Sequence, residues 1–330
     1  MLSHPTEDEW RDKLDVRNKI DFPTLHASGW HGFFARGIID AFVACQHKGN
    51  QKLFMGPGTQ FDIPWPYDKN NYDPYYPKFA WFDYWLKGIN TGIMDEPPIA
   101  YYCLGSGKWK STGQWPPEGI NYTKYYLHSN KTLNTNPPKF DEDPLRYTYN
   151  PKDPVITRGG RNLILPAGSL DQRPVEEGRG DILIYTSDVL KRNVEIAGPV
   201  KVVLSASSSA LDTDFTAKLI DVQPDGSALL ILDGIIRGRY RNSMRKPIPL
   251  KPDQIENFII DLGDISCLFK EGHRIQVDIS SSNFPKYDRN LNSGNVAGRF
   301  FQPAMTRSST RRAPSERGGS SRSRDWAAFI

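Results

Sequence analysis

Residues 193–241 constrain the fold of this chain more than any other stretch. Apolar residues here alternate with polar or small ones at a period of two, the spacing that turns one face of a β-strand toward a core. They are Val200, Val202, Leu204, Phe215, Ala217 and Leu219. The following Gln223-Pro224-Asp225-Gly226 favours a turn, because proline presets φ, aspartate caps the turn and glycine tolerates positive φ. A β-hairpin is therefore expected, with strands as the main building unit.

Short apolar runs separated by Gly, Pro and Asn continue on both sides of this stretch, from about Met94 onward. No helical period is evident after Gly88. Many short strands separated by turns predict a β-sandwich or barrel. The further strands are expected over residues 99–104, 122–128, 182–186, 255–262 and 275–281.

The first 95 residues are organised differently. After a charged surface segment over 1–20, the spacing of apolar residues predicts a strand, a helix, a second strand and a closing helix. This is one α/β unit. Because parallel strands are normally covered on both faces by several βα units, we expect the tail of a larger domain. The four elements are expected over residues 22–30, 34–47, 51–56 and 76–88, the last ended by Gly88.

Composition excludes several classes of protein. No apolar run approaches the roughly 18 residues of a membrane-spanning helix, so a globular protein without a membrane partner is expected. The compartment expected for it is the cytoplasm. Cys45, Cys103 and Cys267 are scattered and form no CxxC, which argues against a disulfide framework and a zinc site and favours buried thiols. No cofactor and no metal are expected.

Residues 299–330 break the pattern. Their middle, Thr306 to Arg324, is mostly Arg, Ser, Thr and Gly with no large apolar residue, a composition that predicts disorder. The net charge of +4 resides in this segment, and the preceding body is nearly neutral. No aromatic residue within that middle would stack on bases, so nucleic acid is not an expected partner.

One ordered series of motifs resembles a known family. Glu195 to Val200, Ser207 to Ala210, Asp212 to Phe215 and Asp221 to Gly226 are similar to the C-terminal β-domain of the X-prolyl dipeptidyl peptidase and cocaine esterase family of serine hydrolases. The resemblance implies the C-terminal remnant of an α/β-hydrolase domain followed by a jelly-roll, a galactose-binding-like β-sandwich. The domains expected are 1–95 for the partial hydrolase, 96–298 for the jelly-roll and 299–330 for the tail.

The resemblance also implies where the catalytic residues belong. The family Asp follows a Gly-Trp turn and falls at Gly32; the family His follows a Gly-Pro turn and falls at Gln60. No G-x-S-x-G elbow occurs in a strand–turn–helix context, and the nucleophile would lie upstream of Met1. Glycine has no carboxylate, and a glutamine amide is no general base near neutral pH.

Two neighbours of these positions are weaker substitutes. His31 stands beside Gly32 and Asp62 lies two residues after Gln60, so a rearranged pair is one alternative; a solvated or hydrogen-bonded role for His31 is the other.

Three further patterns have a functional and a structural interpretation. Asp212 and Asp214 resemble a D-x-D metal site, which would need more oxygen ligands, and a strand-entry turn is favoured. Arg237, Arg239 and Arg241 are expected to share one strand face. A solvated or interdomain face is favoured over a phosphate-binding one. The aromatic residues of 65–126 either line a carbohydrate or acyl pocket or fill the joint between the two domains.

The function implied by the resemblance is hydrolysis of an amide or ester through an acyl-enzyme, with small acyl, ester or peptide substrates. This chain is expected to be inactive alone. The alternative is a noncatalytic jelly-roll module that binds a partner or ligand. Homo-oligomer formation is left open by the sequence.

Overall fold

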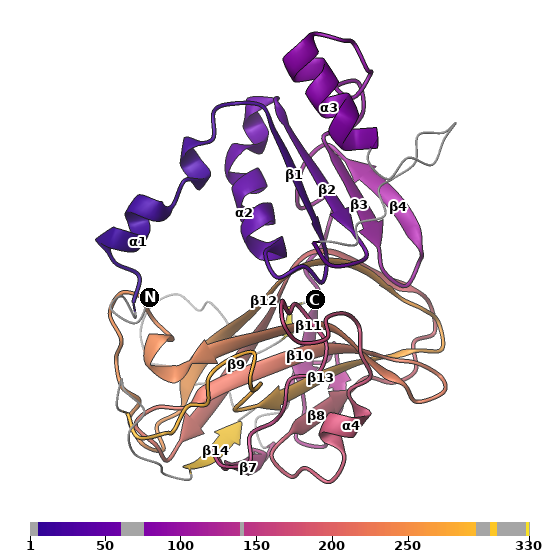
Figure 1. The fold of residues 1–330 in the computed structure, drawn as a ribbon. Coiled ribbons are helices and arrows are strands. Elements are labelled where there is room, and N and C mark those ends of the chain that lie inside the picture. The colour runs from indigo at the N-terminus through magenta and orange to yellow at the C-terminus, as the bar shows by residue number, and fades with distance from the viewer. Residues whose placement is uncertain (1–5, 61–75, 139–141, 295–303, 309–327, 330) are drawn as a thin grey trace, which may run out of the picture.

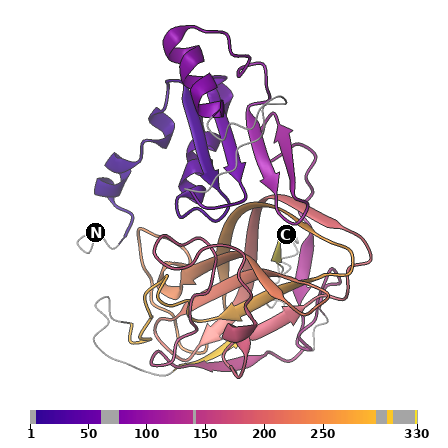
Figure 2. The same cartoon turned by 45° about the vertical axis from the view of Figure 1, so that its right-hand side comes forward.

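The computed structural model describes residues 6–60, 76–138, 142–294, 304–308 and 328–329. An α/β unit stands over one end of a β-sandwich (Figure 1). The two are joined by residues 113–123, which run down from the sheet of the α/β unit (Figure 2).

The α/β unit is a four-stranded sheet with the order β1-β2-β3-β4. β1 (Thr24–Gly29), β2 (Gln51–Gly56) and β3 (Ile99–Cys103) are parallel, and β4 (Lys108–Thr112) is antiparallel to β3. All six residues of β2 are buried, as expected for a central parallel strand.

Two helices cover opposite faces of this sheet. Ile39 and Phe42 of α2 (Ala35–Cys45) pack with Leu53 and Met55 of β2. Trp81 of α3 (Tyr76–Lys87) packs with the intervening Phe54. Because successive side chains of a strand point to opposite faces, one strand serves both layers. The strand, helix, strand, helix order expected from the sequence is confirmed.

The expectation that a strand over 99–104 opens the sandwich is wrong. β3 pairs in parallel with β2 through Leu53 and Ile99, so the sheet continues past the expected boundary between residues 95 and 96. The physical reason is the connection through α3, which returns the chain to the same sheet as a βαβ crossover does. The alternation of residues 99–103 identifies a strand but carries no information on its neighbour.

Before β1 the chain is exposed, as expected. The short helices α1 (Glu9–Leu14) and η1 (Arg17–Lys19) contain no buried residue. Asp8 caps α1 by accepting hydrogen bonds from the amides of Trp10 and Arg11.

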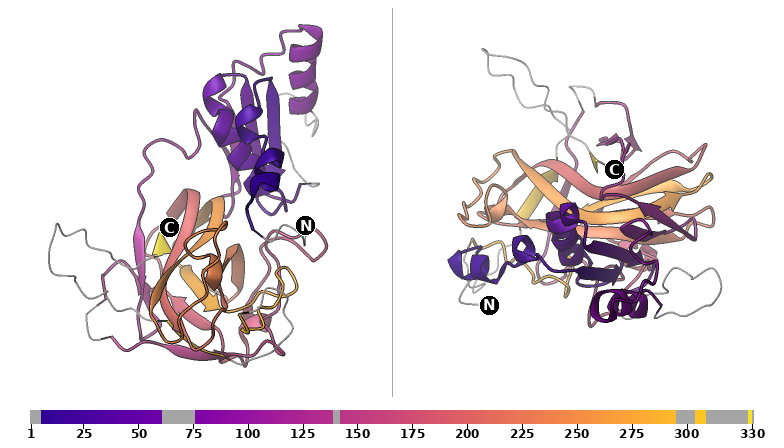
Figure 3. Two further views of the ribbon diagram at one scale, coloured as in Figure 1. Left: turned by 90° about the vertical axis from the view of Figure 1, so that its left-hand side faces the viewer. Right: turned by 90° about the horizontal axis from the view of Figure 1, so that it is seen from above.

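The sandwich is built from two sheets. One has the order β11-β10-β13-β8, and in the other β9 is the central strand, with β12 paired to it (Figure 3). The expected hairpin is confirmed, since β10 and β11 pair in antiparallel register around the turn containing Gly226. The bounds are β8 Leu183–Thr186, β9 Val194–Ser208, β10 Asp214–Val222, β11 Ala228–Arg237, β12 Glu256–Phe269 and β13 Arg274–Ser280.

Short elements complete the sandwich. β5 (Lys124–Leu127), β6 (Leu133–Asn134) and β7 (Arg146–Tyr149) precede the loop over residues 155–171, which we call the joint loop. One turn of helix, α4 (Arg173–Glu176), follows this loop and was not expected. The 3₁₀ turns η2 (Gln46–Lys48) and η3 (Gly238–Tyr240) end α2 and β11.

The expectation of a structureless tail is wrong for two segments. β14 (Ala304–Ser308) pairs with β7 and β9, and β15 (Ala328–Phe329) pairs with β5 and β9. Backbone groups on the edge of an existing sheet accept a strand whatever its side chains, so composition misses such pairing. The remainder of the tail lies outside the described residues.

Phe215→Ala is predicted to destabilise the sandwich strongly. Phe215 is fully buried and its ring lies 4.5 Å from that of Phe258. Removing it should lower the free energy of unfolding by about 3–5 kcal/mol, measured by urea denaturation. Ile164→Ala, at a residue 93% exposed, is the control and should change it by less than about 0.5 kcal/mol. Equal effects of the two variants would contradict this description of the core.

Candidate functional site

The turns that follow β1 and β2 interlock at one end of the sheet. The amide of Trp30 donates to Gly56 O at 2.8 Å, and that of His31 donates to Gly58 O at 3.0 Å. A Cβ at Gly29 would lie 2.0 Å from Gly58 O, so only glycine permits this approach.

The interlock brings the two expected catalytic positions together. A Cβ on Gly32 would lie 3.2 Å from the backbone nitrogen of Gln60 and 2.4 Å from Ser28 Oγ. The Gln60 side chain is already engaged, because its Oε1 accepts a hydrogen bond from the Phe33 amide at 2.9 Å. Positions 32 and 60 are thus adjacent through the backbone of Gln60, but glycine has no side chain and the Gln60 side chain carries an amide.

His31 is buried rather than solvated. It is 5% exposed, and its Nε2 lies 3.2 Å from Ser169 Oγ of the joint loop. Burial, reinforced by the nearby Arg161 charge and opposed by Asp233, lowers the pKa of His31 to about 4. The imidazole is therefore neutral at pH 7. Its low pKa makes it too weak a base for effective general-base catalysis.

Ser169 is a residue that the sequence analysis missed. It comes from the sandwich and meets His31 across 138 positions of sequence. No local signal marks it, because Gly168-Ser169 lies in neither a strand-to-helix turn nor a recognisable motif. Asp62, the other substitute considered, lies outside the described residues.

A carboxylate that would orient His31 is not in hydrogen-bond contact with it among the residues the structure describes. Asp233, whose charge acts on the imidazole, accepts hydrogen bonds from Lys286 Nζ at 2.7 Å and Asn283 Nδ2 at 2.8 Å. Its negative charge is thus stabilised by Lys286. Ser169, His31 and Asp233 do not form the hydrogen-bonded relay that activates a serine.

Arg161 fixes the joint loop against this end of the sheet. Its side chain is partly buried, with Nε donating to Trp30 O at 2.9 Å and a terminal nitrogen donating to Asp264 O. The Asp264 carboxylate accepts a hydrogen bond from Trp115 Nε1 at 2.9 Å. One guanidinium therefore connects the turn after β1, the joint loop and β12. No sequence motif predicted this contact.

The two aspartates of the D-x-D motif lie in ion pairs. Asp214 binds Arg237 through both carboxylate oxygens, each at 2.9 Å, and Asp212 Oδ2 binds Arg239 at 2.6 Å. Asn290 Nδ2 donates to both carboxylates. The expected strand-entry turn is thus held by distant arginines. Across the described parts of the chain, no group of three or more His, Cys, Asp or Glu residues is placed to hold a metal ion.

The expectation for the three arginines is wrong in geometry. β11 ends at Arg237, and Arg239 lies in η3, so they do not share one strand face. Arg239 and Arg241 are largely buried, and Arg241 pairs with Glu256 at 2.7 Å. Alternation alone did not reveal the end of the strand.

Comparisons with known proteins agree with this fold. Residues 91–316 match the family described as the X-Pro dipeptidyl-peptidase C-terminal non-catalytic domain. The chain belongs to the X-prolyl dipeptidyl peptidase and cocaine esterase family. It is 34% identical over 323 residues to the cocaine esterase of Rhodococcus sp. (strain MB1 Bresler), covering 91% of this chain and 56% of that protein. It is 24% identical over 208 residues to a putative Xaa-Pro dipeptidyl-peptidase of Bacillus cereus, covering 62% and 33%.

Solved structures of the family superpose well. An aminopeptidase from the marine sediment archaeon Thaumarchaeota archaeon gives a TM-score of 0.82 at 25% identity, covering 94% of this chain and 57% of that one. An α-amino acid ester hydrolase gives 0.80 at 25% identity, covering 94% and 58%. The chain thus spans little more than half the length of the relatives that it matches over most of its residues. No helix within the described ranges is long and apolar enough to cross a membrane.

Replacing His31 is predicted to flatten the pH dependence of stability. The folded pKa of about 4 lies below the usual 6.5, so the unfolded chain binds the proton first and stability falls as pH drops below about 6.5. Wild type should lose about 2 kcal/mol more than His31→Gln between pH 7.5 and pH 5. Urea denaturation at both pH values measures this.

The exposed His47 provides the control. His47→Gln should keep the pH dependence of the wild type. A His31→Gln variant with the same pH dependence as wild type would show that His31 is not buried as a neutral imidazole.

Proposed function

We propose that this chain is a noncatalytic member of its hydrolase family, unable to carry out acyl transfer with its own residues. The observation that carries the proposal is the pairing of positions 32 and 60 at the ends of β1 and β2. Gly32 offers no carboxylate, and the Gln60 amide already accepts the Phe33 N–H. In a serine hydrolase, losing either the His that acts as general base or the Asp that orients it severely lowers the rate. Here Gly32 and Gln60 stand at both of these positions.

The family chemistry gives this proposal its substrate class. The relatives are named as an esterase and dipeptidyl-peptidases, so the family reaction is attack of a serine on an ester or amide carbonyl, followed by water. We infer that the α/β unit is the C-terminal part of a hydrolase domain and that the sandwich is a jelly-roll. Small acyl, ester or peptide substrates belong to the whole catalyst rather than to residues 1–330.

The pairing of Ser169 with His31 is the strongest argument for residual activity. It fails on two grounds. The pKa of His31 of about 4 leaves little driving force for taking a proton from a serine hydroxyl. The nearby carboxylate of Asp233 accepts hydrogen bonds from Lys286 and Asn283. The hydrogen bond of Ser169 therefore holds the joint loop in place.

A chimeric protein tests the proposal. The part of the Rhodococcus cocaine esterase that this chain does not match would be fused to residues 1–330, and p-nitrophenyl ester hydrolysis measured. We expect the chimera to be inactive and the chimera carrying Gly32→Asp and Gln60→His to gain at least ~10³-fold in kcat/KM. A Cβ at position 32 would meet the Ser28 hydroxyl, which can rotate away, and the backbone oxygen of Gly29 at 3.0 Å and backbone nitrogen of Gln60 at 3.2 Å, which must each shift by a few tenths of an ångström.

The single variants serve as matched controls, because each restores only one group and should recover much less than the pair. The native esterase confirms the assay. Ester hydrolysis by the unmodified chimera, or by purified residues 1–330 above a denatured sample, would contradict the proposal.

A further inference from the structure

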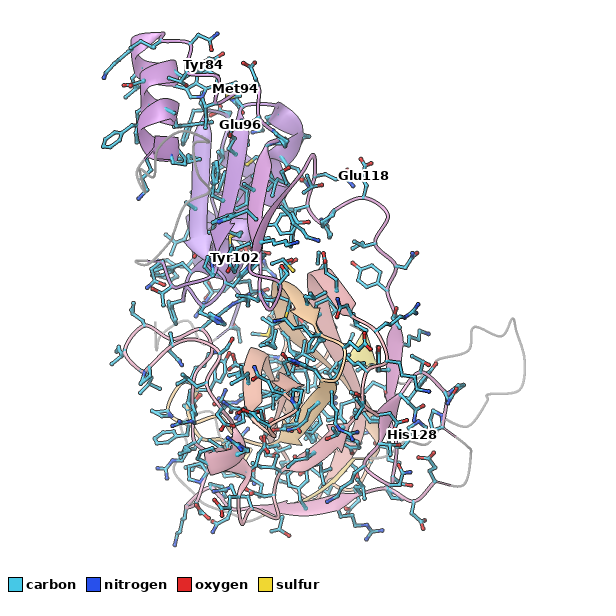
Figure 4. The ribbon with its side chains drawn as sticks, turned by 90° about the vertical axis from the view of Figure 1, so that its right-hand side faces the viewer. Tyr84, Met94, Glu96, Tyr102, Glu118 and His128 are labelled. Carbon is cyan, nitrogen blue, oxygen red and sulfur yellow. The ribbon has the colours of Figure 1, made fainter. Side chains whose placement is uncertain are left out.

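We call residues 113–123, which join the α/β unit to the sandwich, the linker. A cavity of about 420 Å³ lies between this linker and the beginning of β9. The linker contributes residues 117–123 and β9 contributes residues 194–200, with Tyr101 of β3 and Tyr125 of β5 at the sides. Figure 4 shows Glu118 on the linker where it bows away from the sandwich. The cavity shares no lining residue with the site around Gly32 and Gln60, and its size is within the range of small-ligand pockets.

The walls of the cavity are held in place by packing. Gly198 has φ of 136°, and a Cβ there would lie 3.2 Å from Pro116 Cβ and 3.4 Å from Ile120 Cδ1. Trp115 anchors the start of the linker, since its amide donates to Gln46 Oε1 at 3.0 Å and its indole donates to Asp264. The cavity is therefore a preformed feature of the joint.

Three tyrosines give the cavity an electron-rich lining. Tyr101 is 5% exposed, Tyr125 is half-buried and Tyr122 is 57% exposed at the rim. The faces of tyrosine rings attract cations, most strongly where water is excluded. The floor of Val194, Ile196 and Ala197 is apolar, which disfavours a strongly hydrated inorganic ion.

The charged residues of the lining have one sign. Of its sixteen lining residues, only Glu118 and Glu195 are charged. Lys110 lies outside the lining and binds Glu195 at 2.5 Å, which leaves Glu118 as the exposed carboxylate of the lining. Lys110 also acts on Tyr101, and Arg192, outside the lining, acts on Tyr125. An anionic ligand would meet this carboxylate and the tyrosine rings without a compensating cation in the lining itself.

We propose that this cavity binds a small organic cation, an alkyl- or arylammonium ion. Its apolar part lies on the β9 floor, and its charged nitrogen lies near the tyrosines and Glu118. The aromatic walls supply the attraction for the charge, and the apolar floor selects an organic body over a bare ion. This assignment does not depend on whether the chain hydrolyses esters.

Isothermal titration calorimetry of the full chain tests it with three probes that share one ring. Benzyltrimethylammonium is the cation, benzyl alcohol the neutral analogue and benzoate the anion. We expect the cation to bind at least ~10-fold more tightly than benzyl alcohol, and benzoate not to bind. Comparable affinity for either analogue, or no cation binding below roughly 10 mM, would overturn the proposal.

Matched variants locate the binding. Tyr122→Ala should weaken cation binding by about fivefold or more, whereas Tyr122→Phe, which keeps the ring, should stay within about twofold. Glu118→Gln should weaken it by about threefold, and Glu177→Gln, at an exposed carboxylate of the sandwich, should leave it unchanged. Both cavity residues are exposed, so the variants should fold. Full cation binding by Tyr122→Ala would place it elsewhere and refute the assignment.

Discussion

The partly buried guanidinium of Arg161 is the constraint on which the joint between the two parts depends. Removing an arginine from water costs several kcal/mol unless its donors are satisfied. Here they are met by backbone carbonyls of Trp30 and Asp264, one from each part of the molecule. The joint loop can satisfy Arg161 only while the α/β unit and the sandwich remain docked. The contacts of Ser169 with His31 and of Trp115 with Asp264 accompany that docking.

This docking accompanies the meeting of the two positions at which the family resemblance implies a catalytic Asp and His. The glycine-dependent interlock of the two turns places positions 32 and 60 in contact. Acyl transfer requires more than this framework, because the base must titrate near the working pH and be oriented by a carboxylate. Gln60 instead binds backbone, and the nearby His31 is held neutral by burial. On the function proposed above, the two positions meet without forming an acid–base pair.

Sequence predicted what is local and missed what is long-range. The alternation in β9 to β11 and the helical period of α2 depend on neighbours in the chain, and they predicted the hairpin and the helix. The motifs around Gly32 and Gln60 are also local, and the family resemblance that they carry implied that the two positions meet. The sheet to which β3 belongs, the pairing of β14 and β15, and the contacts of Arg161 and Ser169 depend on partners more than 40 residues away in sequence. Alternation and composition carry no information on such partners, and the arginine at position 239 was misplaced because β11 ends two residues earlier.

The central claim of the proposed function is that no serine among the described residues is activated as a nucleophile. Intact-mass spectrometry after incubation with a fluorophosphonate measures this directly, because the reagent forms a stable adduct with an activated serine hydroxyl. The account predicts that the mass of the folded chain stays unchanged at neutral pH. A stoichiometric adduct that maps to Ser169 and disappears in His31→Gln would contradict it.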